Sequence, residues 1–300
     1  MNQDTSAPME NIDELKHSTL GDPCYRLSNS NVFVSPGGLH YTKYLDEINS
    51  NSSQREISDA EIGYIEGQLQ SNSDRFYNQA KIVQKYLKSS NPRLLDIGCG
   101  GGLFLAKMRD IGYTVTGLEL NDTRSFYGKM KYDLEIINEP IEAKYWSAYQ
   151  ESYDVVTLWD VIEHVNYPQS TLKSIFGILK SDGLLFIDTP CRDSFYHIAG
   201  TLSYRISNGR FPLFLNAMYS DHAFGHKQIF STFELKGLLE KLGFEVIEAK
   251  KFHELSFPYI FYLRKIFKLE ALAKFMLPLV SLLLVVFPVR NKMLVIAKKR

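Results

Sequence analysis

Two short segments of the sequence combine residue types that could do chemistry. The first is DIGCGGG at residues 96–102, where an acidic residue comes just before a glycine-rich stretch. The second is DVIEH at residues 160–164, which places two carboxylates and an imidazole close together. Glycine-rich turns cradle nucleotide-like cofactors, whereas clustered carboxylates and histidines act as general bases or bind metals. The sequence thus offers a candidate cofactor site and a candidate catalytic or metal site.

The glycine-rich turn has the flanking elements that a nucleotide-type site requires. An apolar run over 93–97 predicts a strand, and the apolar pattern of 103–108 predicts a helix. Glycines here allow backbone angles closed to other residues and let a ligand approach the main chain. Glu119 follows the next predicted strand, 114–118, at about the spacing of 20 residues where a carboxylate can accept both hydroxyls of a ribose.

Asp96 decides which cofactor this turn favours. A dinucleotide would place a pyrophosphate on the helix N-terminus, and a carboxylate there would repel it. S-adenosylmethionine carries a sulfonium and an ammonium, which Asp96 would attract directly or through water. The turn therefore favours S-adenosylmethionine over a nicotinamide cofactor.

The elements that must position these residues alternate along the chain. Short apolar runs separated by helical patterns are the signature of a parallel sheet with helices on its faces. We predict seven strands, at 93–97, 114–118, 134–137, 153–158, 183–188, 244–249 and 293–297. Helices connect the first five strands, and a helix over 232–242 precedes the sixth. The predicted fold class is α/β, a doubly wound, seven-stranded Rossmann-like sheet.

Several ordered motifs resemble those of the class I S-adenosylmethionine-dependent methyltransferases. They are LLDIGCGGGLFL, VTGLELN, YDVVTLWDVIEHV, LKSDGLLFIDTP and HKQIFSTFELKGLLEKLGFEVIEA, and the resemblance covers residues 64–300. The turn matches the DxGxGxG pattern of the small-molecule enzymes in that class. The resemblance implies methyl transfer from S-adenosylmethionine and a sheet whose last strand is antiparallel.

The resemblance also implies a set of cofactor contacts. In that family, residues after the third strand and at the end of the fourth line the adenine and methionine parts of the cofactor. Carried over, this points to Ile141 or Glu142 near adenine and to Trp159 and Asp160 near the methionine end. The expected cofactor-binding residues are Asp96, Gly98, Cys99, Gly100, Gly102, Glu119, Leu120, Glu142, Trp159 and Asp160.

Asp160, Glu163 and His164 are the catalytic candidates. Methyl transfer from a sulfonium depends mainly on alignment of donor and acceptor, and a base matters chiefly when the acceptor is a hydroxyl. A base or substrate contact at His164, a metal site and a structural role are the alternatives for this segment.

The metal alternative rests on a further resemblance, to the ExxEH element of the metal-dependent O-methyltransferases of ubiquinone biosynthesis. Asp160 replaces the first Glu, and His226 matches a later histidine, with His222 as the competitor. The divalent metal would be held by Asp160, Glu163, His164 and His226. This mixed set of nitrogen and oxygen donors suits Zn²⁺ or Mn²⁺, whereas the resemblance points to Mg²⁺.

Composition limits the partners. Lys plus Arg equals Asp plus Glu at 34 each, so no basic excess favours nucleic acid. The three cysteines form no CxxC pair, and the N-terminus lacks the order of a secretory signal, so we expect a cytoplasmic protein. The expected acceptor is a small molecule, a glycan or a lipid-linked molecule. A non-catalytic, methyltransferase-like binding or scaffolding protein is the alternative.

The chain divides into three predicted parts. Residues 1–20 form a polar, disordered tail, 21–90 an N-terminal helical or lid segment, and 91–300 the methyltransferase domain. Inside the domain, a lid insertion over 191–231 is expected to cover the acceptor, because long connections in compact folds usually have a function. The alternative is a helical insertion that serves packing or dimerisation.

A second insertion, the apolar helical segment 256–289, has two possible surroundings. Its most apolar stretch, 275–289, is short and interrupted by prolines, whereas spanning a bilayer takes about 20 apolar residues. The flanking Lys and Arg side chains allow peripheral contact with the inner membrane surface. The other placement is against the sheet or against a second subunit in a homodimer.

Overall fold

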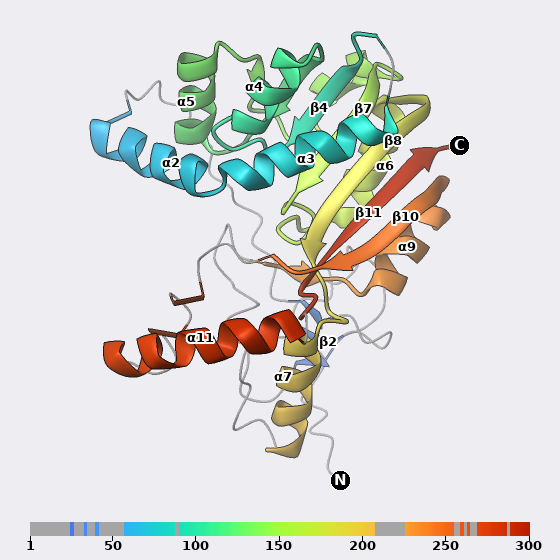
Figure 1. Ribbon diagram of the computed structural model, residues 1–300. Coiled ribbons are helices and arrows are strands. Elements are labelled where there is room, and N and C mark those ends of the chain that lie inside the picture. The colour runs from blue at the N-terminus through green and yellow to red at the C-terminus, as the bar shows by residue number, and fades with distance from the viewer. Residues whose placement is uncertain are drawn as a thin grey trace.

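The computed structural model describes residues 25–26, 33–34, 40–41, 57–87, 90–207, 226–254, 259–260, 263–264, 269–286 and 289–300. The predicted tail 1–20 and His222 lie outside these residues, as do parts of both predicted insertions. The described chain forms a large sheet covered by helices, with two further helices beyond one edge of that sheet (Figure 1).

The large sheet has seven strands in the order β10-β11-β8-β7-β4-β5-β6. They are β4 Arg93–Ile97, β5 Thr114–Leu118, β6 Ile136–Ile137, β7 Tyr153–Trp159, β8 Leu179–Pro190, β10 Phe244–Phe252 and β11 Lys292–Lys299. Strands β4 to β8 are parallel, and β11 runs antiparallel to both β8 and β10. The predicted α/β class, with seven strands and an antiparallel last strand, is confirmed.

The structure moves a limit of four predicted strands, 134–137, 183–188, 244–249 and 293–297, by two residues or more. Two of these differences have a clear cause. The run 134–137 contains a strand of only two residues, because β6 lies at the sheet edge and pairs only with Gly117 and Leu118. The fifth strand begins at Leu179 instead of at 183, because Leu179 pairs with Tyr153 before a register shift. Both limits depend on the neighbouring strand rather than on local hydrophobicity.

Helices cover both faces of this sheet. They are α2 Asp59–Ser71, α3 Ser73–Tyr86, α4 Leu103–Asp110, α5 Asp122–Tyr132, the short 3-10 helix η1 Lys144–Tyr149, α6 Pro168–Ile178 and α9 Thr232–Lys241. Successive β7 residues point to opposite faces: Val156 joins the core under α6 and α9, and Val155 joins the core under α3 and α4. Capping boxes at Ser58 and Ser231 satisfy backbone donors where α2 and α9 begin.

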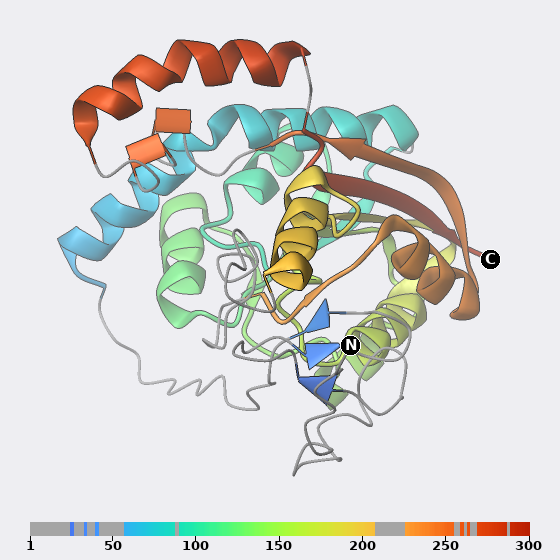
Figure 2. The same ribbon diagram turned by 90° about the horizontal axis from the view of Figure 1, so that it is seen from below.

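Three further features lie outside this core. A small antiparallel sheet joins β1 Tyr25–Arg26, β2 Phe33–Val34, β3 His40–Tyr41 and β9 Gln228–Ile229, and sequence patterns did not predict it. Helix α7, Phe195–Ile206, follows β8, and α11, Glu270–Val286, precedes β11. Figures 1 and 2 place both helices beyond the sheet edge where the parallel strands end. Ligands of doubly wound folds bind at this edge.

Candidate cofactor and catalytic site

The glycine-rich turn joins β4 to α4 at the carboxyl edge of the sheet. The N–H groups of Gly98 and Cys99 both donate to the carbonyl oxygen of Leu118, at 2.7 and 3.1 Å, which fastens the turn to β5. Gly98, Gly100 and Gly102 have φ values of 70, 56 and 81°, in the left-handed region that favours glycine. The backbone path therefore favours glycine at all three positions.

The three glycines nevertheless face different surroundings. A Cβ atom at Gly102 would lie 2.5 Å from Cδ1 of Leu134, and one at Gly98 would lie 2.6 Å from Cγ2 of Val161. At Gly98 and Gly102, therefore, close packing against neighbouring side chains also excludes a larger residue. A Cβ atom at Gly100 would meet nothing within 4 Å. Open space beside the main chain is thus found at Gly100, which is the kind of cradle a bound cofactor needs.

Glu119 faces the turn from the end of β5. Its Oε2 accepts a hydrogen bond from the Gly100 N–H and its Oε1 one from the Asn121 N–H, both at 2.8 Å. These bonds fix the carboxylate and leave it acceptor capacity, because an ionised carboxylate offers about four lone-pair sites. Leu120, the next residue, is half-buried against the core. The carboxylate predicted to hold a ribose therefore lies beside the open position of the turn.

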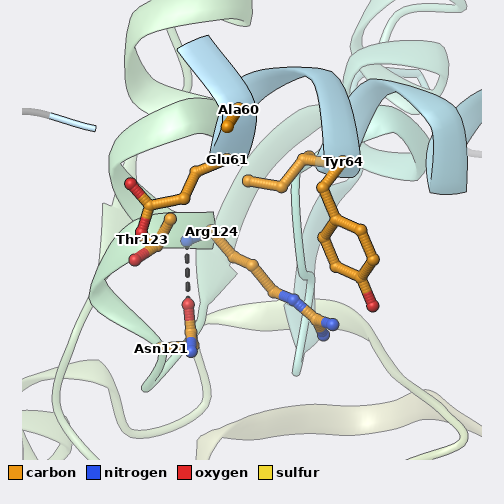
Figure 3. Close-up of a pocket in the computed structure, with 7 residues that line it drawn as sticks. Ala60, Glu61, Tyr64, Asn121, Thr123 and Arg124 are labelled. Atoms are coloured by element: carbon orange, nitrogen blue, oxygen red, sulfur yellow. Dashed lines mark hydrogen bonds between the residues drawn. The ribbon is translucent and has the colours of Figure 1, made fainter. Parts of the chain in front are cut away.

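A pocket of about 390 Å³ adjoins this carboxylate, between α2 and the start of α5 (Figure 3). It is lined by Ala60, Glu61, Tyr64, Ile65, Asn121, Thr123 and Arg124. The Asn121 side chain caps α5 by accepting a hydrogen bond from the Arg124 N–H at 3.0 Å, while the backbone N–H of Asn121 donates to Glu119. One residue of the pocket lining, Asn121, is thus hydrogen-bonded to Glu119, which in turn binds the Gly100 N–H.

Asp96 is buried at the carboxyl half of β4. Its Oδ1 accepts a 2.6 Å hydrogen bond from the Thr157 hydroxyl on β7. Burial raises the pKa of Asp96 to about 8, and the negative charges of Glu119 and Asp188 add to the shift. A positive charge beside the carboxyl group would reverse this shift. The site therefore suits a ligand that carries a cation.

Asp160, the residue after β7, belongs to a network of charged side chains. Its carboxylate lies 2.6 Å from both Arg75 Nη2 and Lys292 Nζ. Its N–H donates to Asp188 Oδ1 at 2.9 Å, and Lys292 Nζ also lies 2.9 Å from Glu254 Oε2. Burial alone would raise the pKa of Asp160, but Lys292 and Arg75 outweigh it and hold that pKa well below its usual range.

This network limits the chemistry of Asp160. A carboxylate held ionised by two cations is a weak base, so the geometry favours a binding role over proton abstraction. Its backbone has a φ of 54°, a left-handed conformation that is uncommon outside glycine and often marks functional sites. Sequence reasoning missed Arg75, Lys292, Asp188 and Glu254 as members of this site, and the only local signal was a lysine directly before an apolar strand.

Glu163, His164 and His226 come together on the other side of this loop. One ligand atom from each lies within 4.8 Å of the other two. His164 Nε2 is 3.9 Å from Glu163 Oε1, and the two imidazole centroids are 4.9 Å apart. The N–H groups of Lys227 and Gln228 donate to the carbonyl oxygen of Glu163, which explains how a distant histidine reaches the trio. Asp160 instead faces the charged network.

Glu163 is the buried member of the trio. Its Oε2 accepts a 2.9 Å hydrogen bond from the Thr189 hydroxyl. Burial and the charge of Asp160 raise the pKa of Glu163 well above its usual range. A neighbouring cation, either a protonated imidazole or a metal, would stabilise the ionised form.

The remaining predicted cofactor contacts differ in their surroundings. Trp159 packs edge-on against Phe104, with ring centroids 5.6 Å apart, and its buried Nε1 has no hydrogen-bond partner in the described part of the chain. An unsatisfied buried donor of this kind calls for a ligand or a water. Ile141 is buried in the core, whereas Glu142 is exposed and accepts a hydrogen bond from Thr171 on α6.

Comparisons with known proteins find relatives over part of the chain. Ubiquinone biosynthesis O-methyltransferases of Salmonella paratyphi A and Glaesserella parasuis are 33% and 32% identical to this chain over 102 and 105 residues. Each match covers 32% of this chain, and the two matches span 42% and 44% of those proteins, so the chain aligns with less than half of each relative.

Solved structures show the fold. A crystal structure of a SAM-dependent methyltransferase from Archaeoglobus fulgidus matches with a TM-score of 0.52 at 19% identity, covering 79% of this chain and 99% of that one. The family model described as a methyltransferase domain matches residues 71–249, which hold the turn, Glu119 and the 160–164 loop. Because that match extends over more than half of the sequence, the chain belongs to the methyltransferase domain family, and it has the fold of the solved methyltransferase.

Proposed function

We propose that the protein transfers a methyl group from S-adenosylmethionine to an oxygen atom of a small-molecule, glycan or lipid-linked acceptor. The observation that carries this proposal is the open cradle at Gly100, which Glu119 faces and which follows the buried carboxyl group of Asp96 in the same turn. When bound, the cofactor supplies a methyl group already activated on a sulfonium. The names of the O-methyltransferase relatives support oxygen as the accepting atom.

The residues of the turn fit this cofactor by their chemistry. Asp96 faces its positive charge, directly or through a water, and Glu119 accepts from the ribose hydroxyls with its remaining lone pairs. Trp159 offers a buried donor, and Asp160 a fixed negative charge, at the methionine end. Cys99 and Leu120 line the same edge.

His164 is the proposed base for an acceptor hydroxyl. The Val161 side chain lies against Gly98, so the loop that carries His164 borders the cofactor turn. The His164 side chain is 32% exposed, which leaves it accessible to an acceptor. With an acceptor and the cofactor bound, the imidazole would take the hydroxyl proton as the methyl group passes from sulfur to the acceptor oxygen and S-adenosylhomocysteine leaves. Glu163 beside the ring would stabilise its charged form.

Gly100→Val should weaken S-adenosylmethionine binding by at least about tenfold, because the side chain would fill the open cradle. Isothermal titration with S-adenosylmethionine, S-adenosylhomocysteine and NAD measures this effect and identifies the cofactor. Gly112→Val is the matched control, since Gly112 also has a positive φ, 97°, and open space around its Cβ direction. Equal affinity in the two variants would place the cofactor elsewhere, and binding of NAD alone would overturn the proposal.

A divalent metal is a second candidate occupant of the Glu163, His164 and His226 trio. The convergence of three ligand atoms within 4.8 Å favours it, and two imidazoles with one carboxylate suit Zn²⁺ or Mn²⁺. Asp160, the fourth predicted ligand, is held by Arg75 and Lys292 instead. A bound metal would polarise the acceptor oxygen and favour its ionised form.

Chelation tests this second candidate. If a metal is used, dialysis against EDTA should lower methyl transfer by about tenfold or more, within the range that a positioned catalytic group contributes. His226→Ala should reproduce the loss, and added Mn²⁺ should restore the wild type but not the variant. Full activity in chelator would exclude the metal and leave His164 as a metal-free base.

A further inference from the structure

Helix α11 carries an exposed row of large apolar side chains. Leu272, Phe275, Leu279 and Leu282 recur every three or four residues and so share one face of the helix, with exposed fractions of 39, 75, 48 and 62%. Ala273, on the opposite side, is fully buried. A helix that is apolar on both faces requires a second apolar contact, and a contiguous exposed row marks an interaction site.

Helix α7 shows the same feature at the same edge of the sheet. Phe195, Ile198, Leu202 and Ile206 follow helical spacing, and each is more than half exposed. The chain enters α7 soon after Pro190 and leaves the α11 region at Lys292, and these two residues are paired across β8 and β11. Figure 2 shows both helices from this side. Both helices thus lie beyond the edge of the sheet that carries the glycine-rich turn.

The charge around α11 distinguishes the two candidate partners of its exposed face, a second copy of the chain and a lipid surface. The segment 255–291 contains Arg264, Lys265, Lys268, Lys274 and Arg290 but only one acidic residue, Glu270. This is an excess of four positive charges in a chain whose net charge is zero. Among the residues of this segment that the structure describes, Arg264, Lys274 and Arg290 outnumber Glu270, which lies 2.6 Å from Arg264 and 3.3 Å from Lys274. A symmetric dimer through this face would bring two copies of this net positive charge together, which costs energy. Anionic lipid head groups would instead attract it.

We propose that α11 docks the protein on an anionic phospholipid surface, with the Leu272, Phe275, Leu279 and Leu282 face in the head-group region and α7 beside the same surface. Within the described residues no helix is long and apolar enough to cross a membrane, so the contact is peripheral. That the acceptor is carried in the bilayer rests on the proposed function. The methyl donor would then lie where the parallel strands end, at the side of the protein nearest the lipid.

Flotation of the full-length protein with vesicles tests this proposal. We expect the wild type to float with phosphatidylglycerol-containing vesicles at low salt and to lose this binding with pure phosphatidylcholine. Phe275→Asp should weaken partitioning by about tenfold or more, because burying one large apolar side chain contributes at least that factor. Phe233→Asp is the matched control, since Phe233 is an equally exposed phenylalanine, 85% against 75%, on α9.

Three outcomes would overturn the docking surface. The wild type could remain at the bottom of the gradient with anionic vesicles, or Phe275→Asp could float as well as Phe233→Asp. A wild-type dimer that becomes monomeric in Phe275→Asp on a sizing column would assign the face to a second copy. Titration of the same samples with S-adenosylmethionine distinguishes failure of the docking surface from failure of the proposed function. If the protein binds the cofactor but does not float, only the docking surface is excluded.

Discussion

Asp96→Asn is expected to weaken S-adenosylmethionine binding by about 100-fold or more, equivalent to about 2.7 kcal/mol. The substitution keeps the side-chain shape and an oxygen that can accept from the Thr157 hydroxyl. It removes only the negative charge that would face the cofactor cation. Isothermal titration measures the change, and Asp110→Asn, at an exposed aspartate of α4, is the matched control.

The same variant should make the cofactor-free protein more stable, by about 1 kcal/mol or more at neutral pH. The pKa of Asp96 is about 8 in the folded chain against 3.8 for the ordinary carboxyl, so the folded state keeps a proton that the unfolded state has released. This contribution to the free energy of unfolding therefore falls as pH rises from 3.8 to about 8. Urea unfolding of wild type and variant across this window should show a flatter pH dependence for the asparagine.

A further consequence is that S-adenosylmethionine binding near pH 7 should release a proton from wild-type Asp96 and none from the asparagine at that position. Titration in two buffers with different ionisation enthalpies measures this release. If Asp96→Asn binds the cofactor as tightly as Asp110→Asn, the carboxylate does not face the cation, and the assignment of this end of the turn fails.

His164→Ala should lower methyl-transfer turnover by about 100-fold or more while S-adenosylmethionine affinity stays unchanged, because a positioned base contributes about that factor. The measurement is single-turnover product formation at saturating cofactor, with the acceptor found by screening phenol, quinone, glycan and lipid-linked compounds. His253→Ala is the control, because that imidazole stacks on Tyr259 away from the trio.

A second variant and two further measurements identify the cause of any loss of activity in His164→Ala. Glu163→Gln should retain part of the activity if Glu163 only positions the imidazole, since glutamine keeps the shape of a side chain whose oxygen lies 3.9 Å from His164 Nε2. Loss of cofactor binding or a lower melting temperature in His164→Ala would instead support the structural role of this segment and remove His164 as the base.

The amino-acid sequence alone determined the glycine-rich turn and the strands on either side of it. DIGCGGG at 96–102 requires left-handed backbone angles and close approach, and these local demands select glycine whatever surrounds them. The runs 93–97 and 114–118 match β4 and β5 residue for residue, because each is buried and bounded by clear turn signals. Strand limits failed where pairing with a neighbour sets the end, as at β6 and at Leu179.

Only the tertiary structure decided what the residues of the 160–164 loop can do. Asp160 resembles a base or a metal ligand in sequence, yet Arg75 on α3 and Lys292 on β11 hold it ionised. His226 joins His164 because β9 is anchored to the Glu163 carbonyl. The pKa of a carboxyl group and the membership of a ligand set depend on burial and on charges within a few ångströms, and distant segments supply both.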